Sequence, residues 1–176
     1  MKLSRKGIIL AALQLAIVAS LAAKYAIDRA RFPRVWAQTV AYDPDLPIRG
    51  RYLSVRLRVD ADRVYGVSPL PRAIQGNFWG DMRDVYLHAE NGHLVASPAP
   101  RPTGLSVTRW KTRSGDVAAA LSEPVDFFLP EHAVDPSRRQ AGEELWVEVT
   151  VPKKGPPRPI RLAVKKGNTF TPLEIK

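Results

Sequence analysis

The 176-residue chain contains no cysteine, only three histidines and only two methionines. The lack of cysteine excludes disulfide bonds, thiolate metal sites and a cysteine nucleophile. The sequence also lacks a Gly-x-Ser-x-Gly element, and its 11 glycines are too dispersed to form a phosphate-binding loop. We therefore predict a protein that is not an enzyme and that binds no cofactor.

The formal net charge of +10 is unevenly distributed along the chain. Residues 1–34 carry a net charge of +6, and the remainder carries +4. Basic residues beside a membrane attract anionic headgroups, at about 1 kcal/mol each. The sequence shows neither interleaved aromatic and basic residues nor the spacing of a helix-turn-helix or zinc finger. We expect a membrane neighbour and no nucleic-acid partner.

One long apolar run occupies residues 7–23 and follows three basic residues, Lys2, Arg5 and Lys6. As a helix this run would be about 26 Å long, close to the roughly 30 Å of a bilayer hydrocarbon core. Lys24 can extend its amine to the headgroups, and Tyr25 is typical of the membrane interface. We predict four parts: a basic tail (1–6), a transmembrane signal-anchor (7–25), a basic juxtamembrane lead-in (26–34) and a β-rich domain (35–176). The resemblance described below implies that the tail is cytoplasmic and the domain extracytoplasmic.

A cleaved signal peptide is the alternative for this segment. Ser20 and Ala22 are small enough for a signal peptidase. The length of the apolar run and the aromatic Tyr25 after it favour an uncleaved anchor. Basic residues flank the run on both sides, so the positive-inside rule does not decide its orientation.

Beyond residue 34 the sequence is typical of short strands separated by turns. In residues 51–59, polar residues alternate with four apolar ones: Leu53, Val55, Leu57 and Val59. Further β-prone runs lie at 36–42, 84–96, 105–110, 117–121, 145–151, 160–164 and 170–175. Asp135-Pro136 predicts the start of a short helix that ends at Gly142. The pattern indicates a mainly β fold: an N-terminal transmembrane helix, then one antiparallel β-sandwich or barrel-like domain with a short helix.

Asn91-Gly92 predicts a two-residue hairpin turn, because both positions tolerate positive φ. Pairing outward from this turn places Glu90 opposite His93, and His88 lies two residues before Glu90 on the same face. Two imidazoles and a carboxylate are ligands that zinc accepts, so a metal-dependent envelope hydrolase is one alternative function. A solvent-exposed polar face is the simpler interpretation.

Residues 60–82 predict a long loop, since they are rich in proline and glycine. Within it, Asn77-Phe78-Trp79 is the apolar segment. This segment either offers a contact for a partner or packs the loop against the core, and the second interpretation is the simpler one.

Residues 42–57 resemble the block that characterises the GDYXXLXY family, in which a membrane span precedes an Asp-Pro…Arg-Gly-Asp-Tyr-x-x-Leu-x-Tyr pattern. The matching residues are Asp43, Pro44, Arg49, Gly50 and Tyr52, whereas Arg51, Val55 and Leu57 replace the family's Asp, Leu and final Tyr. Weaker similarity extends to residues 127–131, 145–151 and 160–164. The resemblance implies a bacterial protein with a single span in the inner (plasma) membrane and a C-terminal domain that faces the periplasm or the outside.

The block predicts four binding residues: Arg49, Gly50, Arg51 and Tyr52. A glycine between two arginines permits close backbone approach, and guanidinium groups bind anions. A structural role, with Gly50 at a bend and Tyr52 packed beside the hairpin, is the alternative. We expect a non-enzymatic accessory module for a membrane or envelope partner. The alternatives are the hydrolase above and an anionic polymer- or lipid-binding module that uses Arg49 and Arg51, with Arg56 and Arg58.

Overall fold

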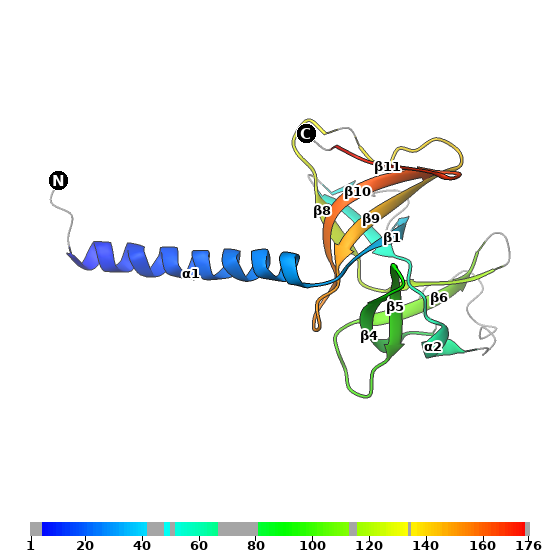
Figure 1. Cartoon of the computed structure of the whole chain (residues 1–176), viewed down its shortest axis with the longest axis horizontal. Helices are drawn as coiled ribbons and strands as arrows, with labels where there is room; N and C mark the ends of the chain where they lie inside the picture. Colours follow the sequence, from blue (N-terminus) through cyan, green and yellow to red (C-terminus); the bar gives the residue numbers. More distant parts are fainter. Residues whose placement is uncertain are drawn as a thin grey trace. The chain divides into compact units, whose positions relative to one another are not determined.

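The chain divides into two compact units, Met1–Phe32 and Pro33–Lys176, in a computed structural model. The structure describes residues 5–41, 48–49, 52–66, 81–112, 116–133 and 135–174. Within these ranges the protein is mainly β, with two antiparallel sheets and one long apolar helix, as the sequence predicts (Figure 1).

The first unit is the helix α1 (Arg5–Arg31), whose 27 residues extend about 40 Å. Its most apolar 18-residue window has a mean hydropathy of 2.0, and none of that window is buried. Among the residues described, α1 is the one helix long and apolar enough to cross a membrane. The helix ends before Pro33, which disfavours helical backbone at the preceding residue. The lead-in predicted at 26–34 is therefore helical as far as residue 31.

The larger sheet of the second unit has the order β11-β10-β9-β1-β3-β2, and β8 also pairs with β3. Its strands are β1 (Arg34–Ala41), β2 (Ile48–Arg49), β3 (Tyr52–Leu57), β8 (Val125–Phe128), β9 (Glu143–Thr150), β10 (Arg158–Lys166) and β11 (Thr169–Pro172). Leu53 pairs with both β2 and β8, and Val55 with both β1 and β8. Because a strand has two edges, β1 and β2 follow one edge of β3 and β8 follows the other.

The smaller sheet has the order β5-β4-β6-β7. Its strands are β4 (Arg83–Glu90), β5 (His93–Pro98), β6 (Ser106–Lys111) and β7 (Val117–Leu121). The predicted hairpin register is confirmed, with Glu90 opposite His93. Asn91 and Gly92 have φ values of 50° and 79°, as a two-residue turn of this kind requires.

Residues 58–60 connect the two sheets through backbone hydrogen bonds. The Arg58 N–H donates to the Gln38 carbonyl (2.9 Å), and the Val59 N–H donates to the Ala119 carbonyl (3.0 Å). The short helix α2 (Asp62–Tyr65) follows at once. The predicted loop at 60–82 therefore begins with ordered backbone pairing and a helical turn, while Asn77-Phe78-Trp79 lies outside the described residues.

Both sheets contribute to one apolar core. Leu53, Val55, Leu57 and Val59, which alternate in the sequence, are all buried in it, as predicted. From the smaller sheet the core includes Val85, Leu94, Ala96, Val107 and Leu121. From β9 and β10 of the larger sheet the core also includes Val147, Val149 and Leu162.

The helix predicted between Asp135 and Gly142 is wrong, since the structure forms turns there. The Asp135 carboxylate accepts a hydrogen bond from the Ser137 N–H (2.8 Å), which stabilises a local turn instead of capping a helix. A second turn, in which the Glu143 N–H donates to the Gln140 carbonyl (3.1 Å), ends at Gly142 with φ 81°. Among the described residues of the domain, the short helix is α2.

Candidate functional site

The predicted binding block lies where β2 and β3 meet. Arg49 of β2 pairs with Tyr52 of β3, while Gly50 and Arg51 lie outside the described residues. Tyr52 is directly opposite Phe128 of β8, and the two rings form an edge-to-face contact with centroids 5.7 Å apart and planes at 70°. Both side chains face solvent, with 49 % of Tyr52 and 52 % of Phe128 exposed. We call Tyr52 and Phe128 the exposed aromatic pair.

Strand alternation explains why this pair faces outward. Leu53 and Val55 lie on the buried face of β3, so Tyr52 and Ser54 lie on the opposite face. Ser54 is paired with Asp126 of β8, and the Ser54 hydroxyl donates to the Asp126 carboxylate. Ladder pairing and this hydrogen bond hold the two strands in register beside the aromatic rings. The exposed pair is thus fixed by the sheet on which it lies.

Two further arginines of the predicted anion-binding set are engaged within the domain. Arg56 is buried, although alternation placed it on an exposed face. The Arg58 guanidinium donates to the Gln38 side-chain oxygen at 2.5 Å. Arg56 is therefore not displayed as the anion-binding module requires, whereas Arg58 is exposed but hydrogen-bonded to Gln38.

Two of the proposed metal ligands on the hairpin, His88 and Glu90, contact an arginine of the protein, Arg63. The Arg63 guanidinium, on α2, donates to Glu90 Oε1 (2.9 Å) and lies 2.8 Å from Glu90 Oε2. It also lies 3.2 Å from His88 Nε2, which is 3.3 Å from Glu90 Oε2. The hydrogen bond from Arg63 holds the pKa of the Glu90 carboxyl below its usual range.

The described residues contain no group of three His, Asp or Glu side chains placed to hold a metal ion. His93 lines a pocket of about 190 Å³ together with Trp36, Arg58 and Trp146. The hairpin face was expected to be solvated, but segment 58–66 partly covers it. Asp60 bridges to Val95, which is buried although it lies on the polar face.

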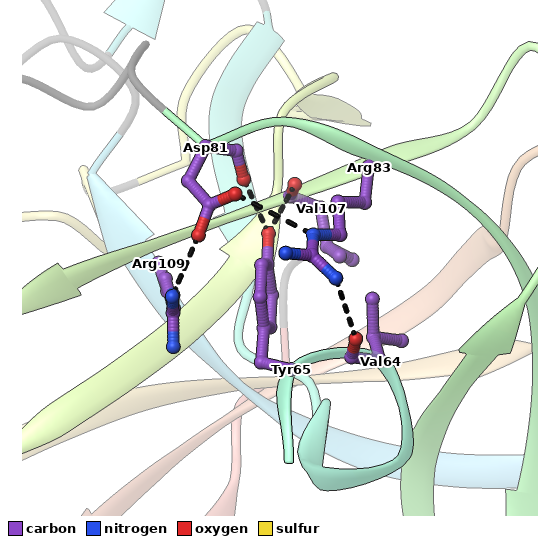
Figure 2. A network of polar contacts seen from close by, with 6 residues as sticks. All are labelled: Val64, Tyr65, Asp81, Arg83, Val107 and Arg109. Atoms are coloured by element: carbon purple, nitrogen blue, oxygen red, sulfur yellow. Dashed lines mark hydrogen bonds and ion pairs between the residues drawn. The ribbon is translucent and has the colours of Figure 1, made fainter. Parts of the chain in front are cut away.

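A polar network surrounds the Tyr65 hydroxyl, as Figure 2 shows. This hydroxyl lies within donating distance of the Asp81 carbonyl (2.5 Å) and the Val107 carbonyl (2.9 Å). Arg109 Nε donates to the Asp81 carboxylate (2.8 Å), and the Arg109 guanidinium stacks 4.4 Å from the Tyr65 ring centroid. Arg83 donates to the Val64 carbonyl at 3.1 Å. The network joins α2 to β4 and β6.

The electrostatics of this network indicate a structural role. Arg109 and Asp81 are 4 % and 13 % exposed, and each neutralises the charge of the other. Burial, with a smaller contribution from the Asp81 charge, raises the pKa of Tyr65 to about 12. A phenol with this pKa stays protonated at neutral pH and is a poor base or nucleophile. The contacts tie residue 65 to residue 81 and so join the two ends of the segment between them.

Sequence reasoning missed this network because its members come from three separate segments. Tyr65, the pair Asp81 and Arg83, and Arg109 are far apart along the chain, and charged residues are common on protein surfaces. The one hint in the sequence was an aromatic residue, Tyr65, within a stretch that was predicted to be a loop.

No family model, curated protein or solved structure matches this chain. The resemblance of residues 42–57 to the GDYXXLXY family stays a prediction. The described polar clusters pair their charges internally, whereas the exposed aromatic pair presents apolar surface to solvent.

Proposed function

We propose that the protein is a non-enzymatic interaction module. A single membrane span carries a β domain that binds another membrane or envelope protein through the exposed aromatic pair, Tyr52 and Phe128. The observation that carries this proposal is the fixed edge-to-face contact of two half-exposed rings, of which Tyr52 belongs to the predicted binding block and Phe128 lies on the neighbouring strand β8. Tyrosine is enriched, and aromatic side chains are prominent, among the residues that dominate binding energy at protein interfaces.

The exposed area is large enough to matter energetically. An aromatic side chain buries about 150–250 Å² when fully covered, so about half of that area remains available on each ring. At about 25 cal/mol per Å², a partner that covers the pair gains roughly 2–3 kcal/mol from each ring. Contributions of this size are typical of residues at the centre of an interface.

We further propose that α1 is the anchor, with its amino terminus in the cytoplasm and the domain in the periplasm or outside a bacterial cell. The length and hydropathy of α1 support a membrane span. The orientation and the inner membrane rest on the resemblance of residues 42–57 to the GDYXXLXY family. Because the chain has no cysteine, a cysteine introduced at the exposed Arg138 reports the topology. Labelling by an impermeant maleimide in spheroplasts is expected, and protection until lysis would reverse the proposed orientation.

Site-specific crosslinking in intact membranes tests the interaction. A photoreactive amino acid at position 128 should capture one membrane or envelope protein, and the same probe at His93 serves as the control. Adding Tyr52→Ala to the position-128 probe should reduce the capture at least tenfold, because about half of the aromatic contact is lost. Equal capture from positions 128 and 93, or capture that Tyr52→Ala leaves unchanged, would contradict the proposal.

A further inference from the structure

A pocket of about 360 Å³ lies between β4, the 99–105 connector and the loop that joins β9 to β10. Polar and apolar groups contribute equally to its lining, and the apolar part includes Leu105 and Pro152, which are buried. Its rim carries the exposed cations Arg101, Lys153 and Lys154. Among the described residues that line it there is no carboxylate. A mixed polar and apolar lining beneath a basic rim fits an amphiphile with an anionic head.

Tyr86 forms one wall of this pocket and is 43 % exposed. Tyrosine, with a solvated hydroxyl and an apolar ring, is enriched in membrane proteins at the level of the lipid headgroups. Lysine ammonium groups bind phosphate as point charges, and arginine binds it through two parallel N–H groups. The pocket therefore combines the three chemistries that a phospholipid headgroup and its glycerol region require.

Chain connectivity keeps this pocket near the end of α1. The Val151 N–H donates to the Pro33 carbonyl at 3.0 Å, and Pro152 and Lys153 follow directly. Only Phe32 separates Pro33 from the last helical residue. At about 3.5 Å per residue, Lys153 stays within roughly 20 Å of the helix end, whatever the relative orientation of the two units. A helix about 40 Å long reaches from one headgroup layer to the other.

We infer that this pocket binds the headgroup of an anionic phospholipid in the leaflet at which α1 ends, and so docks the β domain on the membrane. The inference rests on the proposed role of α1 as an anchor. Docking restricts the directions in which the domain presents its other surfaces, including the exposed aromatic pair, to a partner in the same membrane. The headgroup phosphate is the ligand, and the bilayer is its source.

The test uses the full chain in nanodiscs of phosphatidylcholine, with or without phosphatidylglycerol. A fluorophore attached through Pro156→Cys, in the exposed β9–β10 loop, is quenched by lipids that carry a nitroxide headgroup when the loop lies on the membrane. Phosphatidylglycerol should increase the quenching. Lys153→Gln with Lys154→Gln should lower the docking constant about thirtyfold, since each basic residue near an anionic surface contributes roughly a factor of five.

The matched control is Lys165→Gln with Lys166→Gln, at the far end of β10. Nine residues of strand place that pair about 25 Å from the start of β10, with the same loss of charge. Docking should survive in this control. Equal quenching in neutral and anionic nanodiscs, or an equal loss in both double variants, would overturn the inference.

Two further outcomes separate the sources and the proposals. Soluble glycerol phosphate, titrated into neutral nanodiscs, should leave the fluorescence unchanged up to millimolar concentration. A saturable change of fluorescence in this titration would show that the pocket binds a free anion, and it would overturn docking on the membrane. A chain that fails to enter nanodiscs at all refutes the anchor, whereas a chain that enters but never docks refutes only this inference.

Discussion

The phenol of Tyr65 should control how the stability of the β domain changes in alkaline solution. Its pKa is about 12 in the folded chain, against 10.0 for an unperturbed tyrosine, chiefly because it is buried. The unfolded chain therefore loses this proton first as the pH rises. The stabilisation is fully present below pH 10 and is lost progressively as the pH rises towards 12. Substitution of Tyr65 by Phe removes the titrating group and with it this part of the pH dependence.

The expected magnitude follows from the two pKa values. Proton binding is linked to folding, so ionisation of Tyr65 should lower the free energy of unfolding of the wild type by about 1.4 kcal/mol between pH 8 and pH 11. At pH 8 the Tyr65→Phe variant should be less stable by about 1 kcal/mol. The reason is that this variant lacks the hydroxyl that donates a hydrogen bond to the Asp81 and Val107 carbonyls. The difference in unfolding free energy between the two proteins should therefore vanish near pH 11.

Urea unfolding of the full chain in detergent micelles, followed by tryptophan fluorescence, measures this difference at pH 8, 9, 10 and 11. Tyr86→Phe is the control at pH 8, because its side chain is 43 % exposed and should change stability by less than about 0.5 kcal/mol. A difference between wild type and Tyr65→Phe that stays constant from pH 8 to 11 would refute the assignment of a buried, hydrogen-bonded phenol.

Three further predictions test other parts of the structure. Arg109→Gln removes the nearer of two cations from the Asp81 carboxylate, which keeps Arg83 at 3.4 Å, so urea unfolding should show a loss of about 2–3 kcal/mol, and less in the Asp81→Asn background. Gly92→Ala forces alanine to φ 79° in the hairpin turn, and thermal unfolding should show a loss of roughly 1 kcal/mol. Arg63→Gln removes the donor that lowers the pKa of Glu90, so an NMR titration should find that pKa closer to 4.5 than in the wild type.

Local patterns in the sequence predicted much of the fold. The Asn91-Gly92 turn determined the register of the β4–β5 hairpin, because a two-residue turn leaves one way to pair its flanking residues. The alternation in residues 51–59 identified the buried face of β3. In both cases the decisive interactions connect neighbours along the chain.

The errors arose where the local pattern is compatible with more than one outcome. Asp135-Pro136 is a good helix start, yet the Asp135 carboxylate binds the Ser137 N–H in a turn. Arg56 lies on the polar side of a half-buried pattern and is nevertheless buried. The turn at Asp135 rests on a contact two residues along the chain, whereas the burial of Arg56 depends on what packs against β3.

The candidate site also combines a residue that the sequence indicated with one that it did not. The resemblance of residues 42–57 singled out Tyr52, but nothing in the sequence indicated Phe128 as its neighbour. The two residues are 76 positions apart, and the antiparallel pairing of β3 with β8 brings their rings together. Likewise, the charge of Glu90 suggested a metal ligand until α2 brought Arg63 against it.

By itself, the sequence determined the apolar length of α1, the β character of the rest and the turns at which the strands reverse. These properties depend on hydrophobic periodicity and backbone preference, which act between residues close in the chain. Only the tertiary structure decided the order of the strands, the network around Tyr65 and the outward-facing contact of Tyr52 with Phe128. These features require residues from separate segments to meet, and that meeting is set by the packing of a shared core.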